Sequence, residues 1–272
     1  MDTVSQAQPI ERPGVLANLY ANPSTARTQA TLSSAFQSTL VPSLAYEDAH
    51  FEVYGQTFPK EEVGGDLVDL VAAGNDVIAY VADASGHGLS AAVLVGMVKT
   101  AVRYGLNLGQ DLSEILAGLN HVLPTVKEPD MFATFAGLRF DWSDEVEFTT
   151  AGHVPLLQYR SSQSEIIRHS IPQFPLGLFD DPGYVCGRAR YEAGDVFLLV
   201  TDGIVEASDR QETQFGFARL EQILRELEGR PLPEIFDAAL EAVTQHGAQH
   251  DDQTMLLVRA LSIGRPELTR LM

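Results

Sequence analysis

Four short segments, far apart in the chain, each place an aspartate beside an expected strand end or a tight turn. They are Val63-Gly64-Gly65-Asp66, Asp83-Ala84-Ser85-Gly86-His87-Gly88, Thr201-Asp202-Gly203 and His250-Asp251-Asp252-Gln253-Thr254. Carboxylates that a fold gathers in one place repel one another, and this is normally tolerated only when cations lie between them. The pattern therefore favours a fold that brings these four turns together around an all-oxygen metal site.

The positions of these aspartates support a shared location. Asp66 opens an expected strand, Asp83 and Asp202 close apolar strands, and Asp251 opens the last strand, so all four can lie at one rim of a sheet sandwich. Oxygen ligands without Cys or paired His favour Mg²⁺ or Mn²⁺ over Zn²⁺. Each motif alone is weak, since an Asp-Gly at a strand end is most often a turn and two adjacent glycines can form a bulge.

Composition bounds the class of protein. The chain has 272 residues, of which 45% are hydrophobic and 20% charged, which is enough to bury a large core, and a single main domain is our preferred interpretation. The net charge of -19 comes without clustered Lys or Arg, so nucleic acid and anionic membrane surfaces are not expected as partners. Most of the acidic side chains are expected to be solvated at the surface.

The single cysteine and the start of the chain bear on location. Cys186 permits neither an intrachain disulfide nor a thiolate metal cluster, which is typical of a reducing cytosol. The first 14 residues are polar, and no apolar run approaches the roughly 18 residues that a membrane span needs. We therefore expect a cytoplasmic protein without a membrane segment.

The chain divides into a lead, a helix and one domain. Residues 1–23 lack periodicity and are expected to be a flexible lead. Residues 24–44 are expected to form an amphipathic helix and linker, with Leu32, Ala35, Phe36 and Leu40 in one stripe before Pro42. The stripe can pack on the domain that follows, or it can pair with the same helix of a second subunit and form a homodimer. Residues 45–262 are the expected domain, and 263–272 are a C-terminal tail.

Hydrophobic periodicity within the domain predicts antiparallel sheets with helices outside them, an α+β fold. Helices are expected over residues 90–104, 112–123 (ending before Pro124), 219–227 and 233–246. Strands are expected over residues 51–57, 66–72, 76–82, 131–140, 146–150, 155–160, 166–167, 196–200 and 254–259, with a turn at Gly74-Asn75. Residues 172–183, with their prolines and glycines, are expected to cross the surface irregularly.

The order and spacing of the motifs resemble a known family. From about Val41 to Ala260 the chain is similar to the metal-dependent serine/threonine phosphatases of the PPM superfamily (protein phosphatase 2C-like), and specifically to their bacterial SpoIIE/RsbU branch. The resemblance is carried by residues 62–66, Asp83 through Gly88, Met131-Phe132-Ala133-Thr134, Ala151-Gly152-His153-Val154-Pro155, Pro175-Leu176-Gly177-Leu178, residues 201–204 with Glu206-Ala207, and residues 251–254.

The resemblance implies a four-layer αββα sandwich with two Mn²⁺ or Mg²⁺ ions at one edge. By that analogy Asp83 bridges both ions, Asp66 and the backbone carbonyl of Ala84 hold one, and Asp202 and Asp251 hold the other, whereas the counterpart of Asp252 is less often a ligand. Two such ions hold and activate a water that attacks phosphorus directly. No phosphoenzyme is therefore expected.

Three further side chains are candidates for either a functional or a structural role. His87 could contact phosphate or move a proton, or it could make a structural hydrogen bond within its loop. His153 is expected to be structural, and Lys60 could steer phosphate or simply be solvated. Leu67 and Val68 stand where the branch typically has aromatic residues, which removes no ligand.

The resemblance implies a phosphatase whose substrate is a phosphoserine or phosphothreonine on a small regulatory STAS-type protein, an anti-anti-sigma factor. Regulation is expected through the N-terminal helix, the helices of residues 90–123, or a separate partner. Two other functions stay open: a non-catalytic binding module of the same fold that recognises a phosphoprotein or an anti-sigma partner, and a dinuclear hydrolase of small phosphoesters.

Overall fold

The computed structural model describes residues 40–73, 76–127, 129–141 and 143–262. Three predictions fall outside these residues: the lead of residues 1–23, nearly all of the helix within residues 24–44, and the tail of residues 263–272. The Gly74-Asn75 turn also lies outside them. The domain boundaries at residues 45 and 262 stay predictions.

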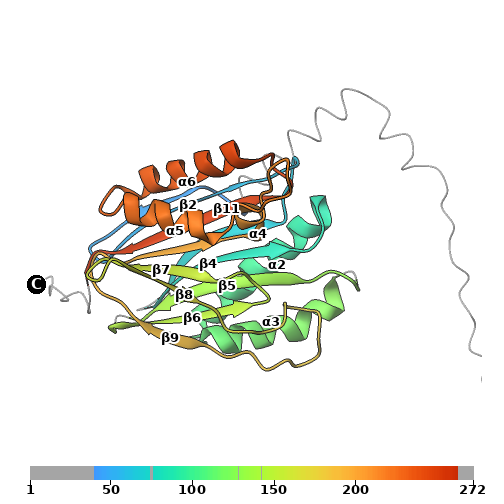
Figure 1. The fold of residues 1–272 in the computed structure, drawn as a ribbon. Helices are drawn as coiled ribbons and strands as arrows, with labels where there is room; N and C mark the ends of the chain where they lie inside the picture. Colours follow the sequence, from blue (N-terminus) through green and yellow to red (C-terminus); the bar gives the residue numbers. More distant parts are fainter. Residues whose placement is uncertain (1–39, 74–75, 128, 142, 263–272) are drawn as a thin grey trace, which may run out of the picture.

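Two antiparallel sheets form the centre of the described structure (Figure 1). The first sheet has the order β1 (Leu44–Glu47), β2 (Phe51–Phe58), β11 (Gln253–Ala260), β10 (Val196–Val200), β7 (Leu156–Arg160) and β8 (Glu165–His169). The second sheet has the order β3 (Asp66–Ala73), β4 (Asp76–Ala84), β5 (Ala133–Phe140), β6 (Glu145–Ala151) and β9 (Gly187–Arg190).

Helices cover the outer faces of both sheets (Figure 1). Helices α2 (Gly88–Asn107) and α3 (Leu112–Val126) lie on the second sheet, while α5 (Phe217–Glu226) and α6 (Leu232–His246) lie on the first. A short helix, α4 (Asp202–Val205), follows β10. The predicted α+β class and the αββα layering are confirmed.

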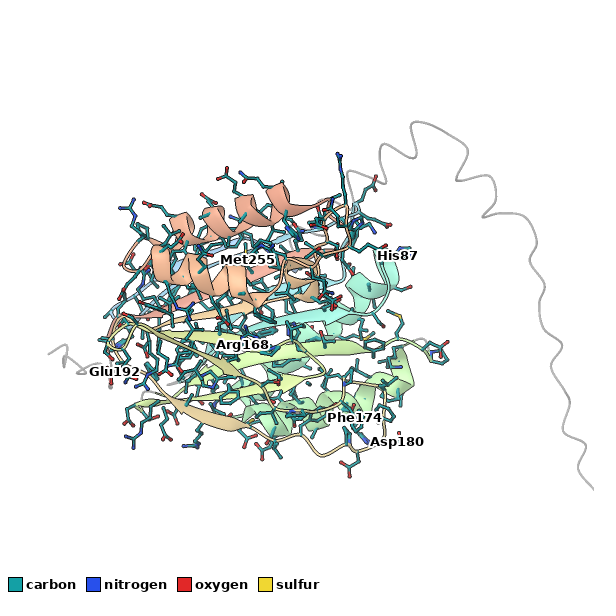
Figure 2. The ribbon with its side chains drawn as sticks, in the orientation of Figure 1. His87, Arg168, Phe174, Asp180, Glu192 and Met255 are labelled. Atoms are coloured by element: carbon teal, nitrogen blue, oxygen red, sulfur yellow. The ribbon has the colours of Figure 1, made fainter. Side chains whose placement is uncertain are left out.

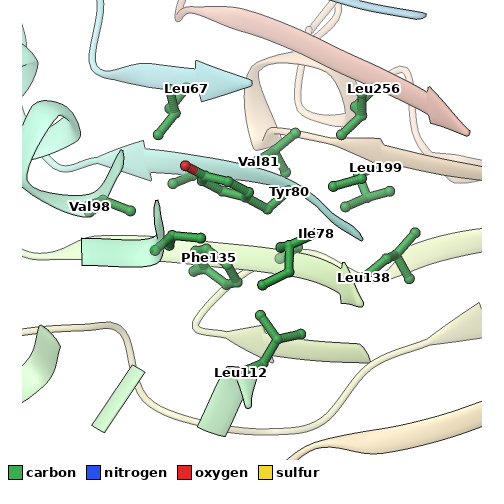
Figure 3. Close-up of a cluster of buried hydrophobic side chains, with 14 of the residues drawn as sticks. Leu67, Ile78, Tyr80, Val81, Val98, Leu112, Phe135, Leu138, Leu199 and Leu256 are labelled. Atoms are coloured by element: carbon green, nitrogen blue, oxygen red, sulfur yellow. The ribbon is translucent and has the colours of Figure 1, made fainter. Parts of the chain in front are cut away.

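The strands in the middle of the first sheet are buried on both faces, which explains their continuous apolar sequence. In β10, Leu199 packs into the cluster between the two sheets, whereas Leu198 packs beneath α5 and α6. Leu256 and Leu257 of β11 divide in the same way, because successive side chains of a strand point to opposite faces. Figure 3 shows Leu199 and Leu256 beside Val81 of β4, where the sheets meet.

The elements differ from the sequence prediction in a few places. Helix α3 does not end before Pro124 but continues to Val126, because a proline in the last turn removes only one helical hydrogen bond, and Lys127 N still donates to Leu123 O. Strands β1 and β9 and helix α4 were not predicted. The remaining predicted helices and strands all have a counterpart, with ends shifted by a few residues.

Helix α2 is long and apolar enough, by length and composition, to cross a membrane, and it is the one such helix among the described residues. Lys99 and Arg103 interrupt its sequence, so it contains no continuous apolar run of that length. Its residues Ala91, Val95 and Val98 are buried against the second sheet. This packing is that of a core helix.

A buried ion-pair network joins α2 to the second sheet. Asp69 of β3 is almost fully buried, and its two carboxylate oxygens accept hydrogen bonds from Arg103 Nε (2.9 Å) and Arg103 Nη2 (2.7 Å). Tyr80 Oη donates to the same carboxylate at 2.9 Å, and Lys99 Nζ lies 3.4 Å from it. Burial, reinforced by the Asp69 charge, holds the pKa of Tyr80 well above its usual range, so Tyr80 remains a donor.

We expect Asp69→Ala to destabilise the protein by about 2–3 kcal/mol, because it leaves Tyr80 and two cations without their shared acceptor while the half-exposed Arg103 regains water. Urea unfolding measures the change. Glu221→Ala, which breaks the more exposed pair with Arg168, is the control and should cost under about 1 kcal/mol. Equal losses in the two variants would show that the buried network is no stronger than a surface pair.

Candidate metal centre

Two of the predicted ligands face each other across a strand pair. Asp66, the first residue of β3, is the direct antiparallel partner of Asp83 in β4. The alternation of side chains puts Asp66 on the face toward the first sheet, whereas Asp69, three residues later, faces α2. Because Asp83 is the cross-strand partner of Asp66, its side chain is on the same face. Asp66 and Asp83 therefore both project into the space between the sheets, at the open end of the β3–β4 hairpin.

The first sheet holds Asp66 in place with two hydroxyl groups. Asp66 Oδ2 accepts hydrogen bonds from Thr201 Oγ1 at 2.8 Å and from Thr254 Oγ1 at 2.6 Å, and all three side chains are buried. Thr201 and Thr254 are also joined to each other, since Thr254 N donates to Thr201 Oγ1 at 3.1 Å. This triad connects the two sheets at the candidate site.

The same two threonines lie close in sequence to the other two predicted ligands. Asp202 follows Thr201 and begins α4, and Asp251 lies three residues before Thr254, in the loop that leads into β11. The structure thus brings Asp66, Asp83, Asp202 and Asp251 to one edge of the sandwich, as the sequence predicted. That they bind metal stays a prediction.

The electrostatics of the cluster are those of carboxylates placed close together. Burial, together with the charges of Asp202, Asp251 and Asp252, raises the pKa of Asp83 to about 7. Burial and the charge of Asp83 hold the pKa of Asp66 well above its usual range, against the lowering effect of the threonine hydroxyls. Burial, followed by the charges of Asp251 and Glu206, also raises the pKa of Asp202. A cation would offset these repulsions.

Asp252 uses its side chain to tie loops together. Its Oδ1 accepts from Lys60 N at 2.7 Å and its Oδ2 accepts from Gly65 N at 2.6 Å, so both oxygens bind the backbone that leads into Asp66. This agrees with the expectation that Asp252 is less suited than Asp251 to be a direct ligand. The packing here is close: a Cβ on Gly203 would lie 1.9 Å from Asp252 O, which no side chain tolerates.

The backbone of Ala84 fits the ligand role expected for it. Ala84 N donates to Gly65 O at 2.9 Å, and a Cβ on Gly65 would lie 2.7 Å from Ala84 O. A side chain at position 65 would therefore block the carbonyl that the resemblance assigns to one ion. Glycine at this position keeps that oxygen accessible beside Asp66 and Asp83.

The residues present fit hard divalent ions by the chemistry of their donor atoms. Among the residues that the structure describes, no group of three or more His, Cys, Asp or Glu side chains is arranged to hold a metal ion. The expected ligand set also includes a backbone carbonyl and waters. The donors are all oxygens, as Mg²⁺ and Mn²⁺ require.

Two small hollows mark the surface of this edge. One, of about 270 Å³, is lined by residues that include Lys60, His87, Asp251 and Asp252, and the other, of about 140 Å³, includes Asp202, Glu206 and Asp251. They share Asp251 and its neighbour in the chain, His250.

His87 and Lys60 lie at the rim of the larger hollow. The His87 side chain is 82% exposed, makes no capping bond to α2, and lies 3.4 Å from Glu61 through Nδ1 and Oε2. The expected hydrogen bond of His87 within its own loop is not formed. Lys60 Nζ donates to His250 O at 2.6 Å, so it bridges two loops of the site. Figure 2 shows His87 at the end of the molecule opposite Glu192.

His153 follows β6 and lies, half-buried, just before the start of β7. Its Nδ1 is 3.2 Å from Val154 O, and its Nε2 is buried with no hydrogen-bond partner among the described residues. Burial lowers the pKa of His153 to about 4. A neutral, packed imidazole agrees with the structural role that the sequence suggested.

Thr201, Thr254 and Asp69 were not among the predicted site residues, although the first two stand inside quoted motifs. A signal was available, because a threonine next to Asp202 and another three residues after Asp251 can each donate to a neighbouring carboxylate. Nothing in the sequence pairs Thr201 with Thr254, which are far apart in the chain. That pairing depends on the register of β10 and β11.

A family model described as Stage II sporulation protein E (SpoIIE) matches residues 73–261, well over half of the chain. The chain belongs to the SpoIIE family. This SpoIIE-family chain is 24% identical over 242 residues to phosphoserine phosphatase RsbU of Bacillus subtilis, which covers 86% of the chain and 70% of RsbU. It is 22% identical over 186 residues to phosphoserine phosphatase RsbP of the same organism, covering 65% of the chain and 44% of RsbP.

Solved structures show the same fold. The SiaA PP2C domain of Pseudomonas aeruginosa matches with a TM-score of 0.75 and 20% identity, over 88% of this chain and 98% of that domain. RsbX in complex with magnesium matches with a TM-score of 0.64 and 21% identity, over 80% of this chain and 99% of RsbX. The predicted family, the PP2C-type fold and the phosphatase class are confirmed, and metal dependence is general for this class.

We expect Thr254→Val to weaken Mn²⁺ binding by about 10- to 100-fold, because Asp66 loses the shorter of its two hydroxyl donors and its orientation is no longer fixed. Isothermal titration of the metal-free protein with Mn²⁺ measures the affinity. Thr149→Val is the matched control, since it removes a buried hydroxyl that donates to Val185 O. An equal loss in the two variants would contradict a specific role for Thr254.

The raised pKa values predict how the stability of the metal-free protein varies with pH. A carboxyl whose pKa is higher in the folded state stabilises the fold at low pH, and this contribution is lost as pH rises from about 4 through the folded pKa, about 7 for Asp83. In chelator, Tm should therefore fall from about pH 5 to pH 8 more steeply in the wild type than in Asp83→Asn.

Asp237→Asn, on the exposed face of α6, serves as the control for this pH series and should retain the wild-type slope. Added Mn²⁺ should reduce the fall in the wild type, since the cation replaces the protons. Parallel curves for the wild type and Asp83→Asn in chelator would contradict the repulsion described for the cluster.

Proposed function

We propose that this SpoIIE-family chain is a protein serine/threonine phosphatase that hydrolyses phosphoserine or phosphothreonine on a regulatory protein and uses two Mn²⁺ or Mg²⁺ ions. The observation that carries the proposal is the carboxylate edge, where Asp66 and Asp83 are paired across one sheet and Asp202 and Asp251 approach from the other. The names of RsbU and RsbP, both phosphoserine phosphatases, support it.

Each group at this edge has a definable task in the proposed reaction. Asp83 would bridge the two ions, Asp66 and Ala84 O would hold one, and Asp202 and Asp251 the other. When bound, the ions would supply a water of lowered pKa and neutralise charge on the phosphoryl group. Thr201 and Thr254 orient Asp66, and Asp252 fixes the loop before it. No protein nucleophile is required, so hydrolysis should be direct.

The shape of the site favours a phosphoprotein over a small phosphoester. The two hollows enclose only about 270 and 140 Å³, whereas sites for small molecules usually enclose roughly 300–1,000 Å³ and bury most of the ligand. A phosphorylated side chain that projects from the surface of a partner can reach such an edge. His87 and Lys60, at its rim, are positioned to meet the partner.

The partner we propose is a phosphorylated STAS-type protein of the anti-anti-sigma class, in the cytoplasm. This rests on kinship with RsbU. The net charge of -19 supports a protein partner over nucleic acid or an anionic membrane.

The test is hydrolysis of a phosphoserine peptide and of an aryl phosphate, each with Mn²⁺, with Mg²⁺ and with chelator. We expect turnover that requires metal and that falls at least about 100-fold in Asp83→Asn, because the bridging charge is removed. Asp237→Asn, an exposed aspartate on α6, should retain wild-type activity.

The other results separate the alternatives. Unchanged turnover in Asp83→Asn with unchanged metal content would refute the assigned ligands, and a trapped phosphorylated residue would refute direct hydrolysis. Bound metal with no turnover of either substrate would favour the non-catalytic binding module. Efficient cleavage of the aryl phosphate alone, with low KM, would favour a small-phosphoester hydrolase.

A further inference from the structure

An apolar groove runs between α2 and α3 on the outer face of the helical layer. It encloses about 740 Å³, and its walls include Val93, Gly96, Tyr104 and Leu108 from α2 and the residue after it, and Val122 from α3. A smaller hollow of about 240 Å³ shares some of this wall and extends it to Leu89, at the start of α2. The groove is distinct from the carboxylate edge.

The groove exposes more apolar surface than a solvated helix pair normally does. Tyr104 is 66% exposed, Leu108 60% and Val122 51%, and Leu89, Val93 and Val126 are also exposed. A contiguous patch of this kind is typical of a surface that binds a partner, a ligand or another segment of the same chain.

The described chain begins beside this groove. Leu40 has a helical backbone, and its Cδ1 would lie 3.6 Å from a Cβ placed on Gly96, a wall residue. Lys99 Nζ donates to Leu40 O at 2.6 Å, and Val41 is buried in the core. The segment that precedes Leu40 is therefore anchored to α2 at its C-terminal end.

The sequence before Leu40 has the complementary pattern. Leu32, Ala35 and Phe36 continue the stripe to which Leu40 belongs, while Ser34 and Ser38 fall on the opposite face. At the helical rise, a helix over residues 24–39 would be about 24 Å long, whereas the part of α2 from Gly96 to Asn107 is about 17 Å long. Such a helix is therefore long enough to follow this part of α2. We propose that residues 24–39 lie as a helix in the groove between α2 and α3 of the same chain.

The anchor favours the same chain over a second copy. Leu40 is the last member of the stripe and already packs on α2 of its own domain, so the preceding turn of the helix starts next to the groove. A segment tethered this closely has an effective concentration on the order of millimolar, which a free second copy does not reach in dilute solution. The inference is independent of the proposed phosphatase activity.

The test measures how quickly a cysteine in the groove reacts with a maleimide. The full chain carries Val122→Cys in a Cys186→Ser background. Adding Leu32→Asp and Phe36→Asp should speed labelling by at least about tenfold, because charges on the stripe release the segment. The matched control, Ser34→Asp with Ser38→Asp, adds the same charge at the same spacing on the opposite face and should leave the rate unchanged. Glu241→Cys on α6, exposed and far from the groove, should react equally in all backgrounds.

A second readout separates one chain from two. Oxidation of a full chain that carries Phe36→Cys and Val122→Cys should give an internal disulfide in a species of monomer mass by light scattering. If the rate of maleimide labelling in the Val122→Cys chain does not change on adding Leu32→Asp and Phe36→Asp, the proposal is overturned. Crosslinks found only between chains, with protection that disappears on dilution, would also overturn it and assign the groove to a second copy.

Discussion

Repulsion among carboxylates is the constraint on which the functional edge of this protein depends. Asp66, Asp83 and Asp202 all have raised pKa values because each is removed from water near another negative charge. The hydroxyls of Thr201 and Thr254 favour the ionised form of Asp66, but they do not remove the repulsion from Asp83. The fold therefore stores an unfavourable arrangement that divalent cations relieve, which is the physical reason to read this edge as a metal centre.

The arrangement requires two strand registers to be correct at once. Asp66 faces the first sheet and Asp69 faces α2 because successive side chains alternate, so a slip of one residue in β3 would move Asp66 away from the threonines and Asp69 away from Arg103. These two buried carboxylates, with opposite directions and different partners, fix the register of β3. The same strand thus serves the site on one face and the helical layer on the other.

Much of this could be predicted from the sequence, and the limits have physical causes. The apolar strand of residues 196–200 and the periodic helices could be predicted because the spacing of apolar residues in the local sequence reflects which side chains are buried. Strands β1 and β9 were missed because they are short and mostly exposed, and α4 because one turn has no detectable period. Helix α3 passed through Pro124 because the loss of one bond near a helix end is small.

The candidate site divides in the same manner. The acidic residues were found because their motifs are local, with each aspartate beside a glycine or a strand end. The threonine pair that holds Asp66 was not predicted. The two threonines lie 135 and 188 positions after Asp66 in the chain, and their contacts with it exist only once β3, β10 and β11 are in place. The bonds from Asp252 to the backbone of residues 60 and 65 are likewise set by tertiary structure alone.

Helix α2 belongs to both the functional edge and the apolar groove. It begins at Gly88, immediately after the turn of Asp83 to His87, and its outer face forms one wall of the groove. Between these, Lys99 contacts Leu40 on one side and Asp69 on the other, and Arg103 fixes Asp69, three residues from Asp66. A segment seated in the groove, as proposed, would therefore touch the helix that begins beside the carboxylate edge, and the buried ion pairs of Lys99 and Arg103 with Asp69 couple that helix to β3.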